Sequence, residues 1–178
     1  MNVLKHVDSN INNLISDLQT LIRQPSVSAK NEGIEECAKL VKKLLKKSGL
    51  KSEILRLKKG VAPIVYGEIK SKQNSTKTLM FYNHYDVQPA EPFDLWDDPP
   101  FSGMRKGNKI FGRGATDDKG ELITRIKAVE ACLKTTGDVP CNIKFVIEGE
   151  EETGSAHIQK YLKKYKKKFS CDGVIWEF

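Results

Sequence analysis

Short apolar runs alternate with amphipathic helical stretches along this 178-residue chain, and the alternation limits the possible folds more than any other feature. The runs at residues 63–69, 79–82 and 142–147 contain many β-branched and aromatic residues and lead into polar segments, as buried strands do. Helices that alternate with buried strands pack on both faces of a sheet. The sequence therefore predicts an α/β fold with a central mixed, mostly parallel sheet covered by helices on both faces.

Apolar periodicity and turn residues give the expected boundaries of the elements. We expect helices at residues 7–22, 32–48, 120–133 and 155–166, and strands at residues 53–57, 63–69, 79–82, 142–147 and from 172 onward. In the last helix, the predicted buried stripe consists of Ile158, Tyr161, Leu162 and Tyr165. Gly107 and Asn108 lie between two short extended segments and predict a hairpin turn.

The formal net charge of +7 comes largely from lysines at residues 42–47 and 160–168. These lysines alternate with apolar residues at helical spacing, which indicates solvated helix faces. Arginines are few and no second basic element is present, so we expect no nucleic-acid partner. No run reaches the roughly 18 apolar residues of a membrane span, and the first thirty residues hold no apolar block typical of a signal peptide. We expect a cytoplasmic protein without a membrane partner.

The cysteines are widely spaced and form no pair with metal-ligand spacing. Two of them fall on apolar faces of expected helices, and two fall near the starts of expected strands. We therefore expect buried free thiols, at Cys37, Cys132, Cys141 and Cys171.

Three clusters of polar residues follow expected strands or the hairpin, where the sites of open α/β sheets assemble. They are NHYD with His84 and Asp86, GRGATDDKG with Asp117 and Asp118, and EGEEETGS with Glu148, Glu150, Glu151 and Glu152. Taken singly, the aspartates could cap a helix and the glutamates could form a solvated loop. Taken together, one imidazole and several carboxylates suit zinc or a similar divalent ion, often as two ions that share a carboxylate.

These three motifs, in this order and at these intervals, resemble a family of zinc-dependent amidohydrolases and exopeptidases. The family includes acetylornithine deacetylase, succinyl-diaminopimelate desuccinylase, carnosine dipeptidase and carboxypeptidase G. The phrase LWDDPPFSG between the first two motifs is typical of the dipeptidase-like branch. The resemblance runs from LIRQPSVS to DGVIWEF and implies a zinc-exopeptidase-like fold that hydrolyses amide or peptide bonds.

The resemblance also implies a role for each residue of the motifs. His84 would bind one Zn²⁺ ion, Asp117 would bridge two ions, and Glu152 would bind the second, with Co²⁺ or Mn²⁺ as possible replacements. Glu151 would be the general base, and Asp86 would hold the ring of His84 through its other nitrogen. Asp118 and Lys119 would support the bridging residue, after a cis peptide bond between Asp117 and Asp118. His6 and His157 are expected to be helix-face residues and not ligands.

The family's site needs a further acidic ligand and a further histidine. Glu177 is the only acid near the first of these positions, and we expect it to be a strand residue. We therefore expect residues 1–178 to be the N-terminal portion of the catalytic domain, incomplete at the C-terminus, with the lid domain absent, and to be inactive alone. The complete enzyme would act on small peptides or N-acyl amino acids and would dimerise through the lid. The alternative functions are a catalytically dead basic interaction module that keeps the fold, and a relative that binds one metal ion.

Overall fold

A computed structural model describes residues 2–73 and 75–176 of the protein. Within these ranges the helices are α1 (Val3–Ser9), α2 (Ile11–Ile22), α3 (Ile34–Lys47), α4 (Lys119–Thr136) and α5 (Ile158–Lys164). The strands are β1 (Lys51–Leu55), β2 (Ile64–Ile69), β3 (Thr78–His84), β4 (Met104–Lys106), β5 (Lys109–Phe111), β6 (Asn142–Glu148) and β7 (Gly173–Ile175). Short 3-10 turns lie at η1 (Ser28–Lys30), η2 (Phe93–Leu95) and η3 (Glu151–Thr153).

The central sheet of the described residues has the strand order β1-β2-β6-β3-β7, and β4 and β5 form the predicted hairpin at Gly107 and Asn108. β6 and β7 run parallel to β3, whereas β1–β2 and β2–β6 are antiparallel pairs. The predicted α/β class with a mixed sheet is confirmed, and its described part holds two parallel and two antiparallel pairings.

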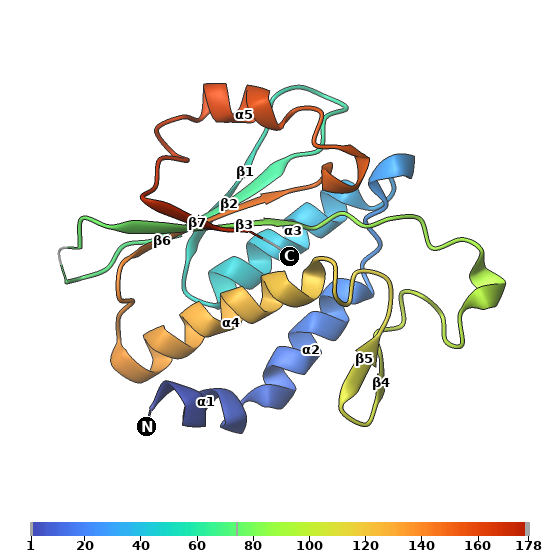
Figure 1. The fold of residues 1–178 in the computed structure, drawn as a ribbon, viewed down its shortest axis with the longest axis horizontal. Helices are drawn as coiled ribbons and strands as arrows, with labels where there is room; N and C mark the ends of the chain where they lie inside the picture. The colour runs from blue at the N-terminus through green and yellow to red at the C-terminus, as the bar shows by residue number, and fades with distance from the viewer. Residues whose placement is uncertain (1, 74, 177–178) are drawn as a thin grey trace.

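Helices cover both faces of this sheet, as predicted (Figure 1). On one face α3 and α4 pack against the sheet and α2 packs against these two helices; together they form the larger core, in which the apolar stripe of α3 is buried. On the other face α5 and the segment after it cover the sheet through Tyr161 and Phe169, which join a smaller core with Tyr66. No helix in the described ranges is long and apolar enough to cross a bilayer.

Two helix predictions need correction. The helix expected at residues 7–22 is interrupted at Asn10, whose side chain donates to the carbonyl oxygen of His6 and so ends α1. Asparagine competes for backbone groups in this way and is a poor helix-interior residue. The helix expected from 155 begins at Ile158, because Gly154 and Ser155 have positive φ and form a turn.

Two burial predictions were also too simple. Leu162, expected in the buried stripe of α5, is 44% exposed, because the described part of this face has no second helix to cover its flank. The cysteines are free as predicted, but full burial is confirmed for Cys37 alone. The other three, Cys132, Cys141 and Cys171, are only partly buried.

The strand register brings two of the polar motifs to one edge of the sheet. β3 and β6 are parallel neighbours, and their last paired residues are His84 and Glu148. The acidic loop after β6 therefore starts beside the histidine that ends β3. Asp117 and Asp118 lie directly before α4, which crosses the same sheet. The predicted elements thus position all three motifs at the carboxyl ends of β3 and β6.

Candidate metal centre

His84 ends β3 and is fully buried, so its ring can be held in one orientation. Its Nδ1 lies 2.9 Å from the backbone carbonyl oxygen of Asp86 and 3.3 Å from a carboxylate oxygen of the same residue. Its Nε2 lies 2.8 Å from Oδ1 of Asp117. Because a carbonyl oxygen only accepts hydrogen bonds, Nδ1 carries a ring proton, and Nε2 points toward the aspartate.

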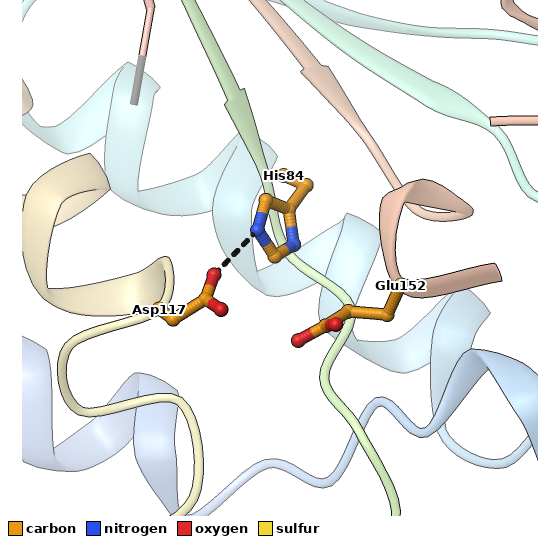
Figure 2. A group of neighbouring side chains, drawn as sticks. All are labelled: His84, Asp117 and Glu152. Carbon is orange, nitrogen blue, oxygen red and sulfur yellow. Dashed lines mark hydrogen bonds and ion pairs between the residues drawn. The ribbon is translucent and has the colours of Figure 1, made fainter. Parts of the chain in front are cut away.

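Three possible ligand atoms gather at this point, one each from His84, Asp117 and Glu152, and all lie within 4.8 Å of one another. Figure 2 shows the three side chains arriving from β3, from the segment before α4 and from the loop after β6. Their convergence is the arrangement that the sequence predicted.

The donor set fits a divalent cation. With the proton on Nδ1, a neutral ring of His84 presents the Nε2 lone pair to the carboxylate of Asp117. Two acceptors at 2.8 Å repel each other unless a proton or a metal ion is shared between them. Glu152 adds a second carboxylate beside the first. One imidazole and two carboxylates are a ligand set typical of zinc and related ions.

Glu151 and Glu152 enter the site from η3, and Asp86 fixes their backbone. The two carboxylate oxygens of Asp86 accept hydrogen bonds from the N–H groups of Glu151 and Glu152, at 3.2 and 3.1 Å. One carboxylate oxygen of Glu151 lies 3.8 Å from Nε2 of His84. Asp86 therefore positions both the histidine ring and the acidic turn, whereas the sequence predicted only the first of these contacts.

Comparison with known proteins decides the family. Residues 80–177 match the model described as "Peptidase family M20/M25/M40". The chain belongs to this peptidase family. It is 42% identical over 110 residues to the human Beta-Ala-His dipeptidase, covering 61% of this chain and 21% of that protein. It is 42% identical over 114 residues to the Cys-Gly metallodipeptidase of Schizosaccharomyces pombe, covering 61% of this chain and 24% of that protein.

A solved member of the peptidase family has the same fold. The M20 family metallo-carboxypeptidase Sso-CP2 from Sulfolobus solfataricus superposes with a TM-score of 0.85 at 39% identity. The match covers 92% of this chain and 37% of that one. This chain therefore spans about a fifth to two fifths of the length of these relatives.

Asp118 and Lys119 follow Asp117 in the chain, and both are buried beneath the candidate site. Oδ2 of Asp118 accepts hydrogen bonds from Nδ2 of Asn83 at 2.7 Å and from the backbone N–H of His84 at 2.9 Å. Burial lowers the pKa of Lys119, whose Nζ donates to the carbonyl oxygens of residues 21 and 24 near the end of α2. The peptide bond between Asp117 and Asp118 is cis, as the resemblance to the peptidase family implied.

The glutamates of EGEEETGS point in different directions. Glu148 is buried, accepts hydrogen bonds from the hydroxyls of Tyr82 and Ser155, and has a pKa raised by its burial. Glu150 accepts from the backbone N–H of Ala62 at 3.2 Å and lies 2.9 Å from Nδ1 of His157. Both therefore brace the loop, and the other two glutamates of the motif, Glu151 and Glu152, lie beside His84.

Gln88 is a site residue that the sequence reasoning missed. Its Nε2 donates to Oε2 of Glu152 at 2.8 Å and to the backbone carbonyl oxygen of the same residue at 3.1 Å. Burial raises the pKa of Glu152 and the charge of Asp117 adds to this, while the Gln88 hydrogen bond lowers it. The only signal in the sequence was the position of Gln88 inside NHYDVQPA, four residues after His84.

Gly149 lets the acidic loop approach β3 closely. A Cβ atom at this position would lie 2.3 Å from the hydroxyl oxygen of Tyr85. Tyr85 is fully buried and donates to the carbonyl oxygen of Pro63 at 2.8 Å, so it cannot move aside. The loop therefore leaves β6 directly above this ring, which brings η3 next to the end of β3.

The two remaining histidines lie away from the cluster, and one acid considered in the sequence is not among the described residues. His157 precedes α5 and faces Glu150, and His6 lies in α1, so neither joins the cluster. Glu177 lies outside the residues that the structure describes. The roles of the cluster residues as ligands and base stay predictions.

Proposed function

We propose that this protein is a metal-dependent peptidase that hydrolyses an amide or peptide bond next to a terminal amino acid. The observation that carries the proposal is the convergence of His84, Asp117 and Glu152 in a member of this peptidase family. A buried imidazole with two carboxylates beside it, at the carboxyl ends of strands, is a place where a metallohydrolase of this fold class would bind its ion.

We propose Zn²⁺ as the ion, in a site for two, with Co²⁺ or Mn²⁺ able to replace it. His84 would bind one ion, Glu152 would bind the other, and the carboxylate of Asp117 has two oxygens with which to bridge them. When bound, such ions lower the pKa of a water molecule from about 15.7 to about 7 and polarise the scissile carbonyl group.

Glu151 is the proposed general base. Its carboxylate is 35% exposed and lies 3.8 Å from Nε2 of His84, so a water molecule can reach it beside the cluster. It would accept one proton from the water as the hydroxyl adds to the carbonyl carbon. It would return this proton to the leaving nitrogen as the C–N bond breaks, which balances the hydrolysis. Asp86 keeps the backbone of Glu151 in place through the hydrogen bond to its N–H.

Small peptides or N-acyl amino acids are the proposed substrates, since the relatives include dipeptidases. We also propose that residues 1–178 correspond to the N-terminal portion of the family's catalytic domain; the match covers 37% of the Sso-CP2 chain. Dimerisation through a lid domain, a cytoplasmic location and the absence of nucleic-acid and membrane partners stay predictions.

Metal content and hydrolysis together test the proposal. The full-length protein encoded by the gene would be purified without chelator, analysed for metal by mass spectrometry, and assayed with Cys-Gly and β-Ala-His. We expect bound metal and turnover that chelator abolishes and Zn²⁺, Co²⁺ or Mn²⁺ restores. A protein without metal and without turnover would instead support the basic interaction module.

A further inference from the structure

We propose that Gln88 is a positioning residue that holds the carboxylate of Glu152 in the orientation needed to bind metal. The inference rests on the proposed function, because it concerns the same metal centre. Gln88 lies outside the group of possible ligands and donates hydrogen bonds to one member of it, Glu152.

The contact is specific in its geometry. The side-chain nitrogen Nε2 of Gln88 donates to Oε2 of Glu152 at 2.8 Å and to the backbone carbonyl oxygen of the same residue at 3.1 Å. The two bonds fix the side chain of Glu152 relative to its own main chain. The N–H group of Glu152 is bound separately by Asp86, so main chain and side chain are both held from the first motif.

The backbone that carries Gln88 is itself anchored on both sides. The N–H of Val87 donates to the carbonyl oxygen of Ser26 at 2.9 Å, in a bridge that pairs residue 87 with residue 27. On the other side, the guanidinium of Arg113 donates to the carbonyl oxygen of Pro89 at 3.0 Å. An exposed glutamine would normally sample several rotamers, but here it projects from a fixed segment.

The site needs such a restraint. Asp117 and Glu152 are both acids within one cluster and repel each other when no cation lies with them. A donor on Oε2 of Glu152 opposes the rotation that this repulsion favours and leaves Oε1 available as a ligand. Partners of this kind typically change metal affinity 10- to 100-fold when they are removed.

Gln88→Met tests the inference, because methionine keeps the length of the side chain and removes the donor. Gln159→Met is the matched control, at an exposed glutamine of α5 that lies away from the cluster. Metal affinity would be measured by competition with a chromogenic chelator on the protein as its gene encodes it. We expect roughly 10-fold weaker binding in Gln88→Met and no change in the control.

Two further readouts distinguish positioning from general stabilisation. The thermal midpoint of the metal-free protein should be the same for Gln88→Met and wild type, and the visible absorption of the Co²⁺-loaded variant should change. Equal metal affinity in variant and wild type would overturn the inference alone. A lowered metal-free midpoint would replace it with a purely structural role. A wild-type protein that binds no metal would overturn the proposed function as well.

Discussion

Two layers of the candidate metal centre differ sharply in burial. The floor consists of His84, Asp86, Asp118 and Lys119, and the rim consists of Gln88, Asp117, Glu151 and Glu152. The side chain of His84 is 1% exposed, whereas that of Asp117, only 2.8 Å away, is 69% exposed. Every floor residue makes hydrogen bonds that also hold the fold together, and the rim residues bond mainly to one another or to the floor.

This difference separates stability from chemistry. Buried polar groups that lose a partner destabilise a protein strongly, whereas substitutions of exposed groups usually change stability by no more than about 0.5 kcal/mol. We therefore expect floor substitutions to affect folding first and rim substitutions to affect metal binding or turnover first.

The largest expected effect is on turnover, at the rim. Glu151→Gln removes the proposed base but keeps the shape of the side chain, so kcat should fall by about 10²- to 10⁴-fold. Metal content and the thermal midpoint should match wild type, since Glu151 is not a proposed ligand and its backbone bond to Asp86 remains. Metal loss equal to that of Glu152→Ala would contradict the separate roles given to these two glutamates.

The next effect is on stability, at the floor. Asp118→Ala leaves the amide of Asn83 and the backbone N–H of His84 without their buried acceptor. We expect the free energy of unfolding of the metal-free protein, measured in urea, to fall by about 3 kcal/mol. Asp94→Ala, at an exposed aspartate of η2, is the control and should stay within about 0.5 kcal/mol of wild type. A small effect of Asp118→Ala would remove the distinction between floor and rim.

Two proposed ligands from different layers give a sharper test. His84→Ala and Glu152→Ala should both lose metal, which elemental analysis measures. Only His84→Ala should also lower the free energy of unfolding without metal, by about 2 kcal/mol, because it empties a buried position. Glu152→Ala should leave that stability unchanged or raise it slightly, because the carboxylate repels Asp117. Equal destabilisation by the two variants would argue against two layers.

The smallest expected effect depends on pH and concerns Glu148, which lies behind the floor. Burial raises its pKa above the ordinary value of 4.5, so the folded protein binds this proton more tightly than the unfolded chain. The stability that protonated Glu148 contributes is fully present below the pKa of this residue in the unfolded chain. It is lost as the pH rises through the pKa of Glu148 in the folded protein. Glu148→Gln should therefore gain stability relative to wild type as pH rises through this window. Urea unfolding at several pH values would measure this difference in the free energy of unfolding. Glu36→Gln, at an exposed glutamate, is the control, and its difference from wild type should not change over the same pH range.

Much of the floor and the sheet could be predicted because local periodicity determines them. The apolar stripe of α3 is buried as its spacing indicated, and His84 ends a strand whose apolar residues gave its position. The edge shared by His84 and the acidic loop follows from two parallel strands and needs no other information.

The rim could be predicted only as a set of residue types. Nothing in the run of glutamates indicates which of them lie beside His84, because the turn at η3 is set by the carboxylate of Asp86, more than sixty positions earlier in the chain. The same limit explains why Gln88 was missed. Contacts between side chains that are distant in sequence also decided the exposure of Leu162, whereas the break at Asn10 depended on one local capping bond.

The fit between Gly149 and Tyr85 has a practical consequence for directed evolution. A mutant library of the acidic loop that varies this position would consist mostly of misfolded members, because any added carbon collides with a ring that is itself bonded to Pro63. Thr153 is exposed and lies in the same loop, so diversity placed there would leave the contact between Gly149 and Tyr85 intact. Keeping glycine at one position and randomising the other would give a library in which most clones still assemble the metal centre.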